Sequence, residues 1–115
     1  MSLIAKETQS GAVTVIHLNG DVLGGPDAAQ LNDRLHQLVS SGHLQVVLDL
    51  TGVSFMNSSG LGMLIGGLTT MKNAGGSLKL ANPAERIQSL LVITKLSSVF
   101  STFSSVDEAI ESFTR

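Results

Sequence analysis

The stretch LDLTGVSFMNSSGLG, residues 48–62, decides the fold of this chain. It begins inside an apolar run, QVVLDL at 45–50, that is typical of a strand buried in the middle of a sheet. A loop at 51–57 follows, and beyond it apolar residues recur at helical spacing at Leu61, Leu64, Ile65, Leu68 and Met71. The stretch therefore predicts a buried strand, a connecting loop and the start of a helix, in that order.

Strands and helices also alternate on either side of this stretch. The sequence predicts strands at 4–8, 13–18, 77–81 and 99–103, a helix from Pro26 to Gly42, a helix that starts at Asn82-Pro83, and a terminal helix after a Ser105–Glu108 capping box. Such alternation gives mostly parallel pairing, while the first two strands form a hairpin. We therefore expect an α/β domain in the order β-β-α-β-α-β-α-β-α. Its four or five strands form a mixed, mostly parallel sheet with helices mainly on one face.

Composition limits the possible functions. The chain has 115 residues, 43% hydrophobic and 14% charged, so a single domain over residues 1–115 is expected. It has no cysteine, which excludes a disulfide framework, a thiolate zinc site and a cysteine nucleophile. A formal net charge of −2, scattered Lys and Arg, and the absence of Trp and Tyr disfavour direct nucleic-acid binding. With no signal peptide and no membrane span in the sequence, we expect a soluble cytoplasmic protein.

Ser58 and Ser59 stand where the central helix is predicted to begin. A helix N-terminus presents unpaired N–H groups and a partial positive charge. A serine there either caps the helix or, once phosphorylated, is held by the same N–H groups. Ser58 is one candidate for the cap. Ser59 is another, and it would leave the Ser58 hydroxyl open to a kinase.

The chain resembles the STAS domain family (sulfate transporter and anti-sigma factor antagonist) in its short, stand-alone bacterial form. The family pattern, roughly D-L-S/T-x-V-x-F-x-D-S-S-G-L-G, matches residues 49–62, and its L-x-G-E/D turn matches residues 18–21. Asn82-Pro83 and the apolar residues between 87 and 100 resemble the family's third helix and last strand. The resemblance covers nearly the whole chain.

This resemblance implies a regulatory binding protein with no catalytic activity of its own and no cofactor or metal. In the family, the first serine of S-S-G, here Ser58, is phosphorylated by a partner that is both an anti-sigma factor and a serine kinase. The unphosphorylated domain binds that partner and frees the sigma factor, phosphorylation breaks the complex, and a serine phosphatase resets it. The expected partners are therefore the anti-sigma factor kinase and a phosphatase, with a weak homodimer as a further expectation.

The expected partner-binding surface comprises the helix start and the turn before the first helix. Its residues are Asp21, Leu23, Asn57, Ser58, Ser59, Gly60 and Met63. Met63 lies off the apolar stripe of its helix, which predicts an exposed side chain, whereas Phe55 and Met56 are expected to point inward.

Three positions depart from the family pattern. Asn57 and Leu23 stand where acidic residues are usual, which puts the standard kinase partnership in doubt without affecting the fold. Lys95 stands where a glycine is common after the third helix, so we expect either a lysine in a left-handed conformation or a changed turn.

The neutral residues at these two positions keep a second function open. The chain would then be an unphosphorylated STAS scaffold or subunit, either stressosome-like or the partner of an ABC-type lipid transporter, with Ser58 as an interface residue.

Other chemistries are disfavoured. The G-x-G-x-x-x-G at 60–66 follows too long a loop for a dinucleotide site, and no acidic residue lies about 20 positions beyond it. The histidines lack the spacing of a metal site: His17, His36 and His43. The acidic residues Asp21, Asp49 and Glu85 are scattered and do not form an acid–base pair.

Overall fold

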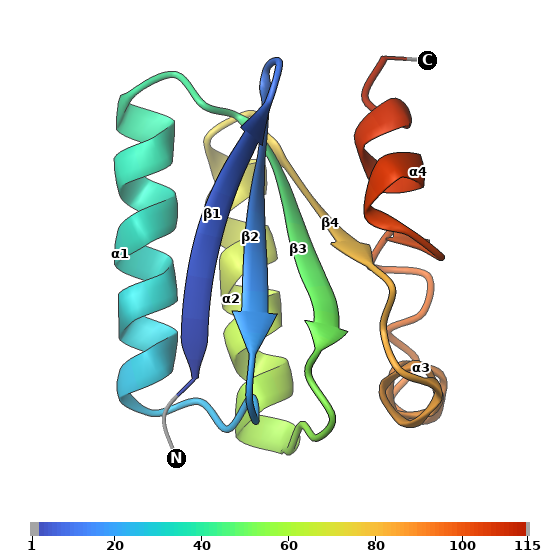
Figure 1. Ribbon diagram of the computed structural model, residues 1–115. Coiled ribbons are helices and arrows are strands. Elements are labelled where there is room, and N and C mark those ends of the chain that lie inside the picture. Colours follow the sequence, from blue (N-terminus) through green and yellow to red (C-terminus); the bar gives the residue numbers. More distant parts are fainter. Residues whose placement is uncertain (1–2, 115) are drawn as a thin grey trace.

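The hairpin and the three parallel crossovers expected from the sequence are present in the computed structural model, which describes residues 3–114 (Figure 1). Its elements are β1 (Ile4–Ser10), β2 (Val13–Asn19), α1 (Pro26–Ser40), β3 (Gln45–Gly52), α2 (Ser58–Asn73), β4 (Ser77–Ala81), α3 (Glu85–Ile93), β5 (Thr102–Phe103) and α4 (Val106–Glu111). The strands form one sheet in the order β1-β2-β3-β4-β5, with β1 antiparallel to β2 and the others parallel. The predicted fold class and element order are confirmed.

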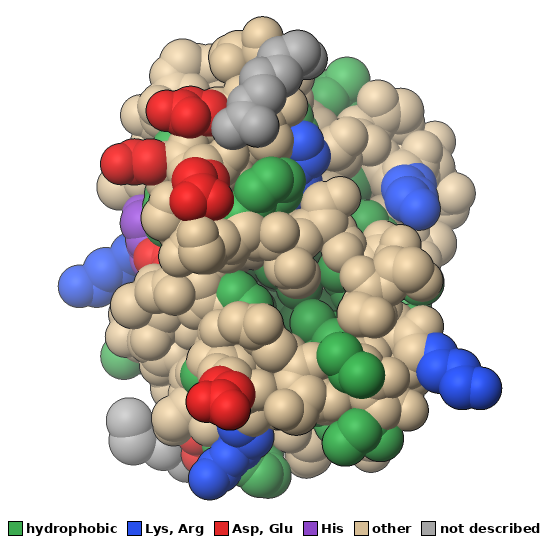
Figure 2. Space-filling view, turned by 90° about the vertical axis from the view of Figure 1, so that its right-hand side faces the viewer, with side chains coloured by type: hydrophobic (Ala, Val, Ile, Leu, Met, Phe, Trp, Pro, Cys, Tyr) green, Lys and Arg blue, Asp and Glu red, His purple; other side chains and the backbone are tan. Residues whose placement is uncertain are grey.

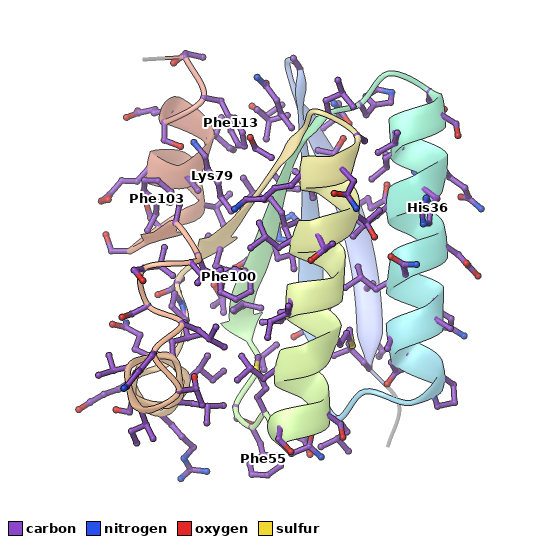
Figure 3. All side chains as sticks on the ribbon, turned by 180° about the vertical axis from the view of Figure 1, so that it is seen from behind. His36, Phe55, Lys79, Phe100, Phe103 and Phe113 are labelled. Carbon is purple, nitrogen blue, oxygen red and sulfur yellow. The ribbon has the colours of Figure 1, made fainter. Side chains whose placement is uncertain are left out.

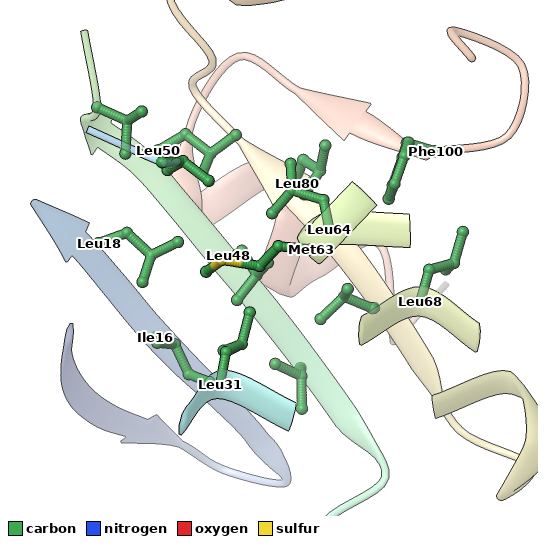
Figure 4. Close-up of a cluster of buried hydrophobic side chains, with 14 of the residues drawn as sticks. Ile16, Leu18, Leu31, Leu48, Leu50, Met63, Leu64, Leu68, Leu80 and Phe100 are labelled. Carbon is green, nitrogen blue, oxygen red and sulfur yellow. The ribbon is translucent and has the colours of Figure 1, made fainter. Parts of the chain in front are cut away.

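The main core lies between one face of the sheet and the helices α1, α2 and α3. Alternate residues of the central strands, among them Ile16, Leu18 and Leu48, point into it and meet side chains of α1 and α2 (Figure 4). Ile87 and Leu91 of α3 join the same cluster. None of the helices within residues 3–114 is long and apolar enough to cross a membrane.

Part of the opposite face of the sheet is covered by α4. There Ala109 packs in a second cluster with four small side chains of the sheet: Val13, Val15, Val47 and Ala81. Towards the carboxyl ends of β2 and β3, the same face carries polar residues instead, beginning with His17 and Asp49. Helices therefore lie mainly, but not wholly, on one face.

Several segment boundaries differ from the prediction, and β3 runs on to Gly52 into the predicted loop. The first strand is longer, and α3 begins at Glu85 rather than at Asn82-Pro83, because Asn82 has a positive φ of 50° and Ala84 is extended. The predicted strand at 99–103 is reduced to two residues. Its first part is a turn instead, since the amides of Val99 and Phe100 both bond to the carbonyl of Leu96.

Three helices end in the same main-chain motif, in which a left-handed residue reverses the chain. Glycine occupies that position after α1 (Gly42, φ 82°) and after α2 (Gly75, φ 80°). After α3 it is Lys95, with φ 62°. The amide of Lys95 bonds to the carbonyl of Val92, and the next amide bonds back to Leu91, which is the Schellman pattern. Of the two alternatives expected at this position, the structure shows the left-handed lysine and not a changed turn.

Candidate partner-binding site

Asn57 caps helix α2. Its backbone is extended, and its Oδ1 accepts a hydrogen bond of 2.7 Å from the amide of Gly60. Ser58 and Ser59 are therefore the first two residues of the helix, and both are exposed. Neither of the two caps considered from the sequence is correct, because the residue before them fills that role. Both hydroxyls are left free of the capping bond.

The turn that contains Asp21 and Leu23 lies against the loop before α2. Val22 pairs with Met56 as an isolated bridge between these loops. The Val22 amide donates to the Phe55 carbonyl at 3.0 Å, and the Val22 carbonyl accepts from the Asn57 amide at 3.3 Å. Both segments follow the carboxyl ends of neighbouring parallel strands, so the topology brings them to one edge of the sheet. The structure thus brings together the two segments expected to form the partner-binding surface.

Two glycines permit this close approach. A Cβ at Gly60 would collide with the main-chain carbonyl of Val22. A Cβ at Gly24, whose φ is 82°, would come within 3.0 Å of Ser59. Gly60 is buried for that reason and serves the site through its lack of a side chain. Asp21 and Leu23 on the other side of the bridge are exposed.

The expectation that Met63 is exposed is wrong: only 5% of the residue is accessible. Helix α2 packs against α1 as well as against the sheet, which turns its buried side towards α1. Met63 fills this space and reaches the main core (Figure 4), whereas Ile65 of the predicted stripe is only half-buried. Met63 is therefore removed from the candidate surface.

Of the two apolar loop residues expected to point inward, only Met56 does so. It is 6% exposed, because its bridge to Val22 places it over the core. Phe55 points the other way, is 42% exposed and lies near the start of α2 (Figure 3). Leu23 is also exposed, at 40%. The serines therefore have two exposed apolar neighbours, Leu23 and Phe55, of which the sequence had predicted Phe55 incorrectly as buried.

Phe55 also borders a shallow groove against α3 that the sequence analysis missed. The groove has a volume of about 440 Å³ and is lined by Phe55, Met56, Arg86, Ile87, Ser89, Leu90 and Ile93. Ile93 and Val92 at the end of α3 are 77% and 63% exposed. Figure 2 faces the side of the molecule on which α3 and α4 lie and shows hydrophobic side chains among the polar surface there. The run of four apolar residues at 90–93, more than one face of a helix buries, is the sequence signal that could have located it.

The remaining titratable candidates are dispersed, with one exception. Within residues 3–114, no three side chains of the His, Asp and Glu types lie close enough to hold a metal ion. Asp49, which the sequence analysis left as a scattered acid, contacts His17 of the neighbouring strand at 2.7 Å. Burial works to raise the pKa of Asp49, but hydrogen bonds from Thr51 and from His17 outweigh it and hold this pKa below its ordinary value.

Comparison with known proteins matches this geometry to a family. The model of the STAS domain matches residues 4–109. The anti-sigma-B factor antagonist of Bacillus subtilis is 39% identical over 72 residues, which cover 63% of this chain and 65% of the relative. The alignment thus spans a little less than two thirds of that protein.

Solved structures agree in fold over almost the full length. A crystal structure of a Thermotoga maritima protein has a TM-score of 0.84 at 21% identity and covers 96% of this chain and 95% of its own. The Bacillus cell fate determinant SpoIIAA, in its phosphorylated form, has a TM-score of 0.73 at 20% identity and covers 96% of this chain and 99% of its own. Since the family model spans nearly every element described above, the chain belongs to the STAS domain family.

Proposed function

We propose that this chain is an anti-sigma factor antagonist that binds an anti-sigma factor with serine kinase activity, and that phosphorylation of Ser58 dissociates the complex. The observation that carries the proposal is the exposed Ser58 at the first position of α2, beside a cap that Asn57 already provides. The relationship to a Bacillus subtilis anti-sigma-B factor antagonist supports the same function. At this site the chain would act by binding rather than by catalysis, and a serine phosphatase would reverse the modification.

The fold is well suited to accept a phosphate at Ser58. By helix geometry, the amides of Ser58 and Ser59 have no partner within the helix, while the Gly60 amide is bound to Asn57. A phosphate adds about −1.5 to −2 charges at neutral pH, and the positive end of α2 favours negative charge. We therefore expect phosphorylation to leave the stability of the domain nearly unchanged.

The complex would tolerate the phosphate far less well. Leu23 and Phe55 are 40% and 42% exposed beside the serines, and the ionisable residue of the expected surface, Asp21, is acidic. A partner that packs on this surface would enclose a dianion between apolar groups, and none of the residues of the expected surface is a cation. A loss of about 3 kcal/mol would weaken binding by roughly a hundredfold.

The experiment pairs variants of Ser58 with its exposed neighbour as control. Each anti-sigma factor kinase encoded in the same genome is tested for binding, then for transfer of phosphate from ATP with Mg²⁺, and the modified residue is mapped by mass spectrometry. Ser58→Ala should bind the partner constitutively, and Ser58→Asp should bind about a hundredfold more weakly while melting at the wild-type temperature. Ser59→Ala should still be phosphorylated at Ser58.

The competing reading is an unmodified STAS scaffold or transporter subunit. Asn57 and Leu23 favour it, because both positions are neutral where the family pattern is acidic. A partner that binds Ser58→Asp as tightly as wild type, with no phosphate on Ser58 after incubation with the kinase, would establish this second function. If the first function holds, Asn57→Asp should raise the rate of phosphorylation and leave the fold intact, since aspartate is an equally good cap.

A further inference from the structure

Three side chains form a continuous polar chain across β1, β2 and β3, on the face of the sheet opposite the main core. His17 of β2 stands beside Asp49 of β3 in the parallel register, and its Nδ1 lies 2.7 Å from Asp49 Oδ2. The Oγ1 of Thr8, on β1, lies 2.9 Å from Nε2 of the same imidazole. A hydroxyl, an imidazole and a carboxylate are therefore joined in the order required of a nucleophile, a base and the group that orients the base.

The hydrogen bonds around Asp49 determine which group donates and which accepts in the bonds from Asp49 to His17 and from His17 to Thr8. Oδ1 of Asp49 accepts from the amide and the hydroxyl of Thr51, at 3.0 and 2.6 Å. A carboxylate can only accept, so Nδ1 of His17 is the donor to Oδ2. In the neutral imidazole, Nε2 then carries the lone pair and accepts from the hydroxyl of Thr8. The base thus faces the proton that it would remove.

The hydrogen-bonded side chains of Thr8, His17 and Asp49 are open to solvent. The side chain of His17 is 30% exposed and that of Asp49 is 13% exposed, while Thr8 is exposed on the edge strand. In Figure 1 the near face of β1 and β2 has no helix over it. A small reagent can therefore approach the Thr8 hydroxyl directly.

A cation is available on the same face. Lys6 stands opposite His17 in the β1–β2 register and is two residues from Thr8, so both lie on one side of the strand. Two residues span about 7 Å, which a lysine side chain covers. Its ammonium can reach the oxygen of an acyl group bound at Thr8.

We propose that Thr8 is an activated hydroxyl that takes an acyl group from activated esters or thioesters, with His17 as general base, Asp49 as a positioning residue and Lys6 as the cation for the developing oxyanion. The Thr8 oxygen forms a bond to the acyl carbon as its proton moves to Nε2 of His17. The bond from the acyl carbon to the leaving oxygen or sulfur then breaks, and the leaving group takes the proton from His17. Water or the next acceptor removes the acyl group from Thr8.

The test uses p-nitrophenyl acetate and the whole chain, with no partner protein. Ser10 provides a matched control, because it is an exposed hydroxyl on the same strand and the same side, two residues beyond Thr8, and pairs with Val13 rather than with a histidine. Peptide mapping should find acetyl on Thr8 and not on Ser10. Alkaline hydroxylamine should remove it, because it cleaves oxygen esters but not the amides formed on lysines.

Two variants test the roles of the base and the positioning residue. His17→Gln should slow acetylation of Thr8 by at least about a hundredfold, the usual contribution of a general base. Asp49→Asn should also slow it, and Thr8→Ser should retain it. Thermal melts show whether each variant is folded, and the Thr8–Ser10 comparison in the wild-type chain needs no variant. Equal acetylation of Thr8 and Ser10, acetyl on His17 with none on Thr8, or an unchanged rate in folded His17→Gln would overturn the proposal.

Discussion

Gly60 and Gly62 of helix α2 should respond in opposite ways to alanine, although only one residue separates them. At Gly62 a Cβ meets no atom within 4 Å, so Gly62→Ala gains the helix propensity of alanine, about 0.8–1.0 kcal/mol, at no steric cost. At Gly60 a Cβ would collide with the Val22 carbonyl, which is main chain and cannot rotate away. The turn would have to move, and the Asn57–Val22 hydrogen bond would be disturbed.

These effects are large enough to measure in a domain of this size. With about 2.1 cal/mol/K of unfolding entropy per residue, a chain of 115 residues changes its melting temperature by about 4 °C for each kcal/mol. Gly62→Ala should therefore melt about 3–4 °C higher than wild type. Gly60→Ala should lose about 2 kcal/mol, within the range for overpacked sites, and melt about 8 °C lower.

Equilibrium urea unfolding gives the two free energies directly, and equal m-values would show that the denatured state is unchanged. A lower melting temperature for Gly62→Ala, or a neutral Gly60→Ala, would refute the close packing of the turn on α2. Partner binding adds a second measurement. If the proposed partner approaches α2 closely at its exposed glycine, Gly62→Ala should weaken the complex while it stabilises the free domain.

Three further predictions follow from the caps and ion pairs. Asn57→Ala should cost about 1 kcal/mol in urea unfolding, the usual loss for an N-cap, whereas Asn57→Asp should cost nothing. Lys95→Gly should raise the melting temperature by a few degrees, because it relieves a left-handed lysine worth about 1 kcal/mol of strain. The hydrogen bond from Arg34 lowers the pKa of Glu7 below its ordinary value of 4.5. The ionised Glu7 thus makes its full contribution to stability above pH 4.5, and this contribution is lost as the pH falls through the lower pKa of the folded state. When the free energy of unfolding is measured from about pH 7 to pH 3, Glu7→Gln should therefore lose less stability than wild type.

The fold could be predicted because its main signals are local and agree with one another. The apolar run ending in Asp49-Leu50, the glycine after α1 and the capping spacing of Ser105 each identify an element without knowledge of its neighbours. The structure confirms these elements and the left-handed Lys95.

The details of the site depended on contacts that a pattern does not contain. Met63 is buried because α1 packs beside α2. The apolar pattern of α2 alone does not show that a second helix covers this side of it. Met56 points inward and Phe55 outward because a bridge to Val22, distant in sequence, fixes the loop. The cap was predicted at Ser58 or Ser59 and is Asn57, because the three residues are nearly equal in capping preference and only the backbone geometry distinguishes them.

The bridge between Val22 and Met56 has a thermodynamic consequence for any complex formed at this surface. Two loops that would otherwise sample many conformations are held by main-chain hydrogen bonds before a partner arrives. Ordering a flexible segment on binding costs free energy, and a surface already in its bound shape avoids that cost. Association here should therefore resemble rigid docking, with a heat-capacity change that reflects buried apolar area rather than coupled folding. A substitution that loosens the bridge should speed dissociation more than it slows association.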